Sequence, residues 1–294
     1  MRIFCIVFTF CICFTGLVTA QPDTEVYLLD LSYKDGKYTV SNPKSISANN
    51  PGYDNQPSFD QSGKYLYYVA TRNGQTDIVQ VNLENNSKTW ISNTPEGGEY
   101  SPVLSPAEKF VSAVQLENSD RQLLWKYPLE SGNAEVLIKE AKIGYYCWID
   151  KDRLAAFVLG EPSTLQVFNV NENTSKRIAE NIGRSLHLIP GKDRISYISK
   201  EEKEWTIWSF NPKNGKSKRV TCSLTGSEDM AWTAENSILM GKDNKIYYKN
   251  PRRDKQWNEI ESFTALNMDG ITRMAVSPDG KKLAVVVNEG KTQQ

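Results

Sequence analysis

The stretch VSPDGKKLAVVV, residues 276–287, follows the same residue pattern as FDQSGKYLYYVA, residues 59–70, near the other end of the chain. In each stretch an apolar residue precedes a turn built on Asp, Ser and Gly. A lysine follows the turn, and an apolar segment comes next. Asp, Ser and Gly favour tight turns, whereas β-branched and aromatic residues favour strands, so each stretch is typical of a β-hairpin.

The same hairpin recurs between these two ends at a nearly constant spacing. We mark each copy by the first apolar residue after its turn, and the markers are Leu66, Val111, Leu154, Ile195, Ile238 and Leu283. Successive markers are separated by 45, 43, 41, 43 and 45 residues. A repeat of this length suits a unit of four short strands, as in the blades of a β-propeller.

Each unit also continues in the same order after its hairpin. A polar break with Gly or Asn leads to a third, alternating strand such as DIVQVNL or WTIWSFN, and a second turn leads to a fourth strand such as KRVTC. Alternation with a period of two indicates half-buried strands. No ten-residue segment shows a capped helical pattern, so we predict an all-β chain, a six-bladed β-propeller of four-stranded blades.

The two ends of the chain are each half a blade. Residues 25–47 have only a third and a fourth strand, and residues 271–288 have only a first and a second. Pairing them in one sheet would close the ring and cover strand edges that otherwise template aggregation. Two stacked sandwiches, the alternative architecture, would not explain these complementary halves. The expected blades are 49–93, 94–140, 141–180, 181–222, 223–262, and 263–290 joined with 25–47.

The hairpins carry a family resemblance. QPSFDQSGKYLYYVATRNGQTDIVQVNL (residues 56–83) and MAVSPDGKKLAVVV (residues 274–287) resemble the TolB-like propeller repeats, which are relatives of WD repeats found in secreted bacterial proteins. YSPVLSPAEKFVSAV (residues 100–114) fits this pattern partly, and the middle three units keep only the spacing. The resemblance covers the whole of residues 21–294 as a single propeller domain. It implies a fold shared by periplasmic scaffolds and by the gating propellers of serine peptidases, and fold does not imply function.

The first 20 residues, MRIFCIVFTFCICFTGLVTA, have the plan of a secretory signal peptide. Arg2 precedes an apolar run that ends in small residues, which predicts cleavage after Ala20 and a secreted or periplasmic protein. An uncleaved membrane anchor is one alternative, because the run is close to the lower limit for a span. Lipidation is another, although Cys11 and Cys13 do not follow a small residue.

Composition limits the partners and the chemistry. Removal of residues 1–20 leaves 34 basic and 35 acidic residues, since only Arg2 is lost from 35 of each, so we expect no nucleic-acid partner. We also expect a monomer with no transmembrane segment in the mature chain. The mature chain keeps two cysteines, Cys147 and Cys222, which we predict to be free and largely buried on strands of different blades.

No sequence motif identifies a catalyst, a cofactor or a metal site. The chain has no GxSxG elbow, no Walker loop and only one histidine, which excludes a His-rich zinc site. Propeller ligands meet the loops that precede the innermost strands, which gives these ligand or partner candidates: Tyr53, Asp54, Gln56, Glu99, Tyr100, Tyr145, Tyr146, Arg184, His187, Asp229 and Arg273.

Mixed Tyr, Arg and acidic side chains suit a protein, a peptide or a small polar ligand. We therefore expect a non-enzymatic binding scaffold of the cell envelope. One alternative is that these loops only hydrogen-bond to one another. Another is a propeller hydrolase or lactonase, in which acids on separate loops, such as Asp54, Glu99 and Asp229, hold a metal in the central channel. Two interpretations are open for Glu99, Glu228 and Asp229: carboxylates that pair across the channel, and solvated loop residues.

Overall fold

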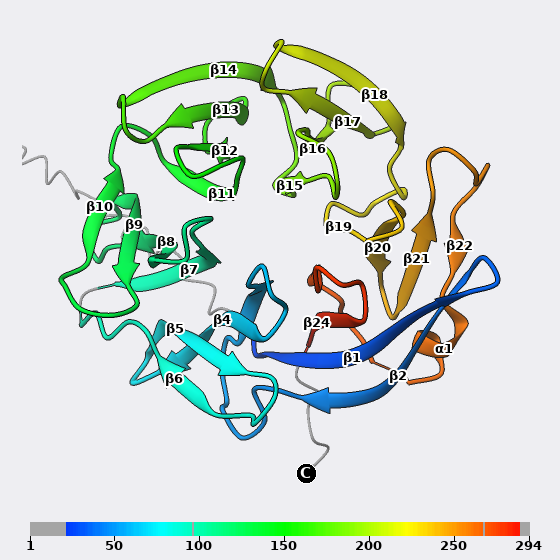
Figure 1. Cartoon of the computed structure of the whole chain (residues 1–294), viewed down its shortest axis with the longest axis horizontal. Coiled ribbons are helices and arrows are strands. Elements are labelled where there is room, and N and C mark those ends of the chain that lie inside the picture. The colour runs from blue at the N-terminus through cyan, green and yellow to red at the C-terminus, as the bar shows by residue number, and fades with distance from the viewer. Residues whose placement is uncertain (1–21, 96, 267, 289–294) are drawn as a thin grey trace, which may run out of the picture.

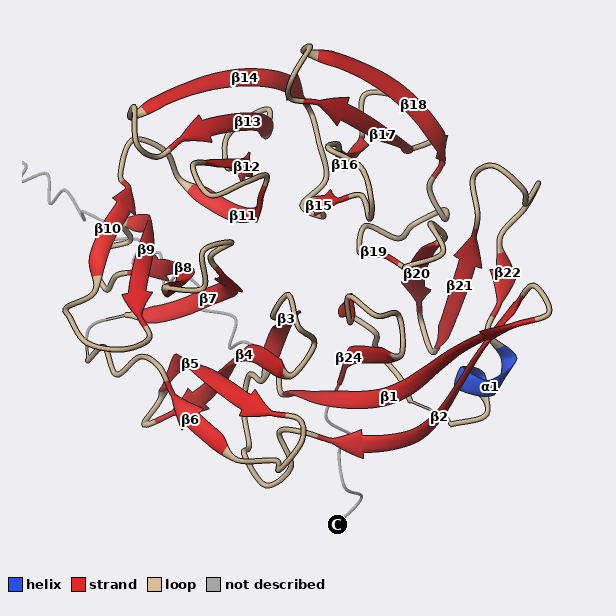
Figure 2. Cartoon of the chain, in the orientation of Figure 1, coloured by secondary structure: helices blue, strands red, loops and turns tan. Residues whose placement is uncertain are grey.

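Six antiparallel sheets of four strands each are arranged in a ring, which makes the chain a six-bladed β-propeller (Figure 1, Figure 2). The structure is a computed structural model that describes residues 22–95, 97–266 and 268–288. The all-β prediction and the number of blades are confirmed. Two stacked sandwiches are excluded by the ring.

In each blade the first strand named below is the innermost. Blade 1 contains β3 (Asn55–Phe59), β4 (Tyr65–Arg72), β5 (Gln75–Asn82) and β6 (Lys88–Trp90). Blade 2 contains β7 (Gly98–Leu104), β8 (Phe110–Leu116), β9 (Gln122–Pro128) and β10 (Glu135–Ile138). Blade 3 contains β11 (Ile143–Trp148), β12 (Arg153–Val158), β13 (Thr164–Asn169) and β14 (Thr174–Glu180).

The remaining three blades follow the same order. Blade 4 contains β15 (His187–Leu188), β16 (Ile195–Ser199), β17 (Thr206–Asn211) and β18 (Lys216–Cys222). Blade 5 contains β19 (Met230–Trp232), β20 (Ile238–Lys242), β21 (Lys245–Lys249) and β22 (Asn258–Glu259). Blade 6 contains β23 (Arg273–Val276), β24 (Lys282–Asn288), β1 (Thr24–Lys34) and β2 (Lys37–Ser45).

The quoted hairpins are held by their turn residues. In the first, the Asp60 carboxylate accepts hydrogen bonds from the amides of Ser62 and Tyr65, and Gly63 takes a φ of +73°. In the second, the Ser277 hydroxyl accepts a hydrogen bond from the amide of Lys282, and Gly280 also takes a φ of +73°. A left-handed φ costs glycine nothing, so the Gly of this pattern is a requirement of the turn.

The six markers of the repeat are equivalent in the structure. Each lies on the second strand of its blade and has 0% of its surface exposed: Leu66, Val111, Leu154, Ile195, Ile238 and Leu283. Burial of a Leu, Ile or Val side chain stabilises a fold by about 1.5–3 kcal/mol. The sequence therefore repeats because every blade needs a buried apolar side chain at this same core position.

Blade 6 is built from both ends of the chain. β24 pairs with β23 on one side and with β1 on the other, in a register that runs from Thr24 opposite Asn288 to Asp30 opposite Lys282. The predicted closure of the ring by N-terminal and C-terminal strands is confirmed.

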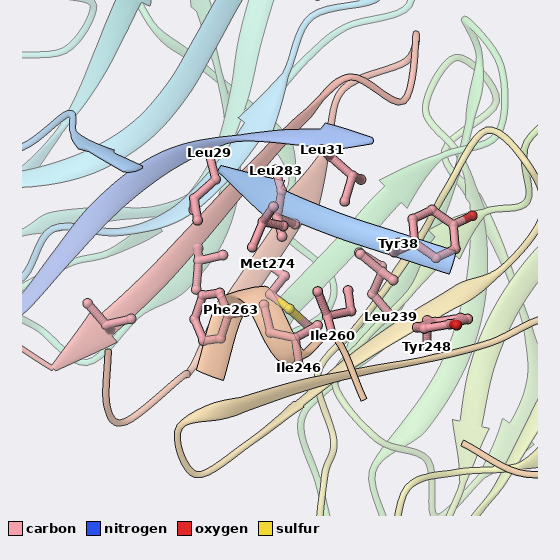
Figure 3. Close-up of a cluster of buried hydrophobic side chains, with 14 residues drawn as sticks. Leu29, Leu31, Tyr38, Leu239, Ile246, Tyr248, Ile260, Phe263, Met274 and Leu283 are labelled. Atoms are coloured by element: carbon pink, nitrogen blue, oxygen red, sulfur yellow. The ribbon is translucent and has the colours of Figure 1, made fainter. Parts of the chain in front are cut away.

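One short helix, which the sequence pattern did not predict, completes this closure. α1 (Glu261–Thr264) connects blade 5 to blade 6 and buries Phe263 in a cluster with Leu29, Ile246 and Leu283 (Figure 3). The Ser262 hydroxyl accepts a hydrogen bond of 2.8 Å from the amide of Val40 on β2. The helix therefore fastens the N-terminal strands to the neighbouring blade, where β22 has only two residues.

The predicted signal peptide, residues 1–20, lies outside the described residues. Within residues 22–95, 97–266 and 268–288, no helix has the length and apolar character needed to span a membrane.

Cys147 on β11 and Cys222 on β18 are free, as expected, and stand in different blades. We expect largely buried thiols, and both residues are partly buried in the structure. Cys147 lies on the innermost strand of blade 3, and Cys222 lies on the outermost strand of blade 4.

Candidate functional site

A central cavity of about 770 Å³ runs between the innermost strands of the six blades. These strands all begin at one face of the ring, because every blade starts with its innermost strand and the blades are equivalent. We call this end of the cavity the mouth. Polar and charged residues gather at the starts of the strands, where they line the cavity: Gln56, Ser101, Tyr145, Arg184, Asp229 and Arg273.

The Asp229 carboxylate is the centre of a charged network at the mouth. It accepts hydrogen bonds from Arg184 Nη2 at 2.6 Å and from Arg273 Nη1 at 3.2 Å. These three residues come from blades 4, 5 and 6, so one carboxylate joins three neighbouring blades. Burial lowers the pKa of Arg184, but the hydrogen bond and charge of Asp229 outweigh it and hold that pKa above its usual value. Two guanidinium groups share one carboxylate, and the network carries a net positive charge.

Arg273 also reaches the opposite side of the ring. Its Nη2 donates a hydrogen bond of 2.7 Å to the hydroxyl of Tyr145, and its guanidinium carbon lies 5.2 Å from the centre of that ring. Tyr53, from the loop before β3, packs its ring edge against Tyr100, with centroids 6.2 Å apart. Burial raises the pKa of Tyr53 to about 12 against the opposing charge of Arg273. The mouth thus combines tyrosine rings with arginine side chains.

The far end of the cavity is mainly apolar, although Gln61 and Ser277 also line it. Its lining there includes Leu104, Ile149, Pro190, Val276 and Pro278, at the ends of innermost strands or in the turns that follow. The cavity therefore changes from charged at the mouth to mainly apolar at the opposite face. A ligand that enters from the mouth meets hydrogen-bonding groups first and apolar walls later.

His187, the one histidine of the chain, lines the middle of the cavity. Its Nε2 lies 3.0 Å from the hydroxyl of Ser185. Burial lowers the pKa of His187 to about 4, although the charge of Asp229 acts in the opposite direction. The imidazole is therefore neutral at pH 7 and contributes a polar group without a charge.

Asp54 is buried behind the mouth and does not line the cavity. Its Oδ1 accepts hydrogen bonds from Asn50 Nδ2 at 2.7 Å and from the amide of Thr71 at 3.3 Å. Its Oδ2 is buried and has no hydrogen-bond partner among the described residues. Burial raises the pKa of Asp54 to about 6, against the hydrogen bonds from Asn50 and Thr71.

Glu99 is fully buried between blades 1 and 2. Its carboxylate accepts hydrogen bonds from the hydroxyls of Tyr127 at 2.9 Å and Ser92 at 3.1 Å. The Ser92 hydroxyl also lies 3.0 Å from Asp77 Oδ1, so the two carboxylates share its one hydrogen. Asp77 comes from the TDI segment of the repeat pattern and is paired with Arg72 at 2.9 Å. Burial raises the pKa of Glu99. This part of the repeat pattern therefore joins adjacent blades.

The structure brings part of the predicted set to one cavity. The candidates that line it are Gln56, Tyr145, Tyr146, Arg184, His187, Asp229 and Arg273. The others lie outside its lining: Tyr53, Asp54, Glu99 and Tyr100. Burial does not separate the two groups, because Gln56 and Tyr146 are buried and line the cavity, whereas Tyr53 and Tyr100 are partly exposed and do not. The direction of each side chain decides, and a sequence pattern of loops before strands carries no signal for it.

The three acids of the metal-site alternative lie in separate clusters. Asp54 contacts Asn50 and Thr71, Glu99 contacts Tyr127 and Ser92, and Asp229 contacts two arginines. In the described part of the chain, no group of three His, Cys, Asp or Glu residues is placed to hold a metal ion. Glu228 pairs with Lys200 at 2.8 Å. The interpretation as a solvated loop residue is wrong for Glu99, which is fully buried on β7. Glu228 and Asp229 are partly exposed loop residues that form ion pairs with Lys200 and with Arg184 and Arg273, and the three acids do not pair across the channel.

Comparison with protein-family models gives no match, and comparison with curated proteins gives none either. Solved structures do resemble this chain. A putative TolB from Agrobacterium tumefaciens has a TM-score of 0.69 at 13% identity, over 92% of this chain and 99% of that chain. TolB from Acinetobacter baumannii has a TM-score of 0.59 at 12% identity, over 91% of this chain and 64% of that chain.

An enzyme has a similar backbone. An oligogalacturonate lyase from Vibrio parahaemolyticus has a TM-score of 0.54 at 11% identity, over 94% of this chain and 100% of that chain. At such identities the likeness concerns the fold. The chain has the fold of a TolB-like six-bladed propeller, and that fold carries both binding proteins and enzymes.

Proposed function

We propose that the protein is a secreted or periplasmic, non-enzymatic propeller that binds a protein, a peptide or a small polar ligand at the mouth of its central cavity. The observation that carries this proposal is the Asp229 network, in which Arg184 and Arg273 share a single carboxylate. Each guanidinium has five N–H donors, so donors remain for an incoming acceptor. Tyrosine and arginine are also the residues that most often dominate binding energy at interfaces.

The chemistry of the mouth favours a ligand with a carboxylate or carbonyl group. The net positive charge of the network attracts an anionic group, and the effect is local because the chain has 35 basic and 35 acidic residues in total. The apolar far end of the cavity would receive an apolar part of the same ligand. An acidic or C-terminal peptide segment combines these two properties.

The decisive experiment is co-purification from the native envelope with quantitative mass spectrometry. Arg273→Gln should deplete the specific partner, because it removes the donor that reaches both Asp229 and Tyr145. Arg177→Gln is the matched control, since Arg177 is exposed on the outermost strand of blade 3. Equal capture by the wild type and by Arg273→Gln would reject the mouth as the binding site.

Location needs its own measurement. The proposal expects a mature protein that begins at Gln21, detected by N-terminal sequencing of protein from the native cell. A mature chain that retains Met1 would reject cleavage after Ala20.

The metal-enzyme alternative predicts a different result. Calorimetry with Mn²⁺ or Ca²⁺ would show tight, stoichiometric binding that Asp54→Ala and Asp229→Ala abolish. Non-enzymatic binding predicts no such heat. Of Asp54, Glu99 and Asp229, only Asp229 lines the cavity, and its carboxylate is already paired with Arg184 and Arg273.

A further inference from the structure

A second cavity, of about 350 Å³, lies at the junction of blades 4 and 5. It is formed by the turns that follow β15, β19 and β21 and by the outermost strand β18. Since β15 and β19 run away from the mouth, these turns lie on the opposite face of the ring. Five of the side chains that line this cavity are cationic: Lys192, Arg194, Lys218, Arg219 and Arg252.

Comparison with the preceding blade explains why two of these cations, Arg194 and Arg219, lack acidic partners. In blade 3, Arg153 precedes the marker Leu154 and pairs with Asp150 at 2.7 Å. In blade 4, Arg194 stands at the same place before the marker Ile195, but Gly191 stands where blade 3 has Asp150. Arg194 therefore has no carboxylate at the position from which Asp150 neutralises Arg153 in blade 3.

The outermost strands differ in the same way. On β14, Arg177 pairs with Glu180 at 2.9 Å. On β18, Arg219 occupies the equivalent register position, because Arg177 pairs opposite Gln166 and Arg219 opposite Trp208. Cys222 takes the place of Glu180, and Arg219 Nη2 donates to the Cys222 sulfur at 3.3 Å.

No other carboxylate compensates within the described residues. None of the five cations forms an ion pair there, and the adjacent Asp193 pairs with Lys213 at 2.5 Å instead. Partial burial lowers the pKa of Lys192, and the charges of Arg252 and Arg194 lower it further. The cavity is therefore a concentration of positive charge that the protein itself leaves unneutralised.

We propose that this cavity binds a small, multiply charged anion that carries phosphate groups, of which a diphosphate is the simplest form. Three guanidinium groups offer the paired N–H donors that match phosphate oxygens, and the two ammonium groups add charge. The volume suits a small ligand, and Ile189, Val220 and Trp232 provide an apolar wall for the rest of it. This site is separate from the mouth and does not depend on the function proposed there.

Calorimetry with inorganic pyrophosphate at low ionic strength tests the proposal. The wild type should bind one equivalent, and Arg194→Gln with Arg219→Gln should weaken binding by at least about tenfold, because both forked donors are lost. The matched control is Arg153→Gln with Arg177→Gln, the same two positions in blade 3, which should leave the affinity within about twofold. Thermal unfolding of each variant verifies that it is folded.

A gain of charge provides the reciprocal test. Cys222→Glu supplies the carboxylate that blade 3 has at Glu180, and it should weaken pyrophosphate binding in an otherwise intact chain. Sedimentation with vesicles of phosphatidic acid, against vesicles of phosphatidylcholine, distinguishes a lipid headgroup from a soluble ligand as the source of the phosphate. No binding of pyrophosphate by the wild type, or equal loss in the blade 3 and blade 4 variants, would overturn the proposal.

Discussion

Nη2 of Arg273 donates a hydrogen bond of 2.7 Å to the hydroxyl of Tyr145, although β23 and β11 belong to blades 6 and 3. In a ring of six, these blades face each other, as Figure 1 shows. The two side chains therefore meet over the cavity, and the same guanidinium contacts Asp229 in blade 5. One arginine couples three blades at the mouth.

We expect this coupling to be measurable in a double-mutant cycle of Asp229→Asn and Arg273→Gln. Their side chains are only 17% and 15% exposed, so the interaction energy in urea unfolding should be about 1–3 kcal/mol. The exposed pair Lys213 and Asp193 is the control, with an expected interaction below about 1 kcal/mol. Equal interaction energies in the two cycles would contradict a special role for the network.

Closure of the ring predicts the effect of a single core substitution. Leu29 on β1 lies opposite the marker Leu283 on β24, and both are 0% exposed. Leu29→Ala should therefore lower the free energy of unfolding by about 2–5 kcal/mol. Thr39→Ala, at an exposed position of β2 in the same blade, should change it by less than about 0.5 kcal/mol.

Removal of residues 21–47 is the more severe form of this test. It leaves one edge of β24 without its partner, so we expect aggregation or early melting. A truncated protein that remained monomeric, with the thermal stability of the full chain, would refute the closure argument.

The sequence predicted the ring because its signal is repeated. Leu66, Leu154 and Leu283 are far apart in the chain, yet each fills the same core position of a blade. A repeated hairpin needs the same turn residues and the same buried apolar residues each time, so both recur at a constant spacing in the sequence. The helix around Phe263 occurs once, at the join of blades 5 and 6, and no repeat could indicate it.

Asp54 predicts an unusual dependence of stability on pH. Burial raises its pKa from the ordinary 3.8 to about 6, so the folded state binds more protons than the unfolded state between these values. Stability from this group is therefore lost as the pH rises from about 4 to about 6, by up to about 3 kcal/mol in full. Asp54→Asn abolishes this titration, and its stability relative to the wild type should increase across that window.

Urea unfolding of both proteins at pH 4.5 and pH 7 is the measurement. His187 titrates with the opposite sign, because its lowered pKa makes stability fall as the pH drops below 6.5 toward about 4. That contribution is common to both proteins and cancels in their difference. If the difference in unfolding free energy between the two proteins did not change with pH, the pKa of Asp54 would be the same in the folded and unfolded states, and the prediction would be wrong.

The two thiols should differ in reactivity. Burial raises the pKa of Cys147 to about 12, so almost none of it is thiolate at pH 8. Iodoacetamide should therefore modify Cys222 before Cys147 in the folded protein and both equally in urea. Intact mass should show no disulfide, since the two residues stand on strands of different blades. A disulfide within the purified monomer would contradict these strand positions.

The candidate site was less predictable than the ring. Arg184, Asp229 and Arg273 could be named because each begins an innermost strand or precedes one by at most three residues. Asp54 and Glu99 occupy similar places in the sequence, yet their side chains turn into the protein and bind neighbouring hydroxyls and amides. Side-chain direction in a loop depends on contacts from other blades, and a single sequence does not contain them.

The pairing of Thr24 with Asn288 in blade 6 also makes the chain suitable for circular permutation. A short linker can join these two residues, and new ends can be opened before β3, at residue 48. In this permutant every blade is continuous in the sequence, while each strand keeps its neighbours. The contacts within blade 6 are the same in both chain orders. The difference in unfolding free energy between them therefore measures how much stability comes from building this blade out of both ends of the chain.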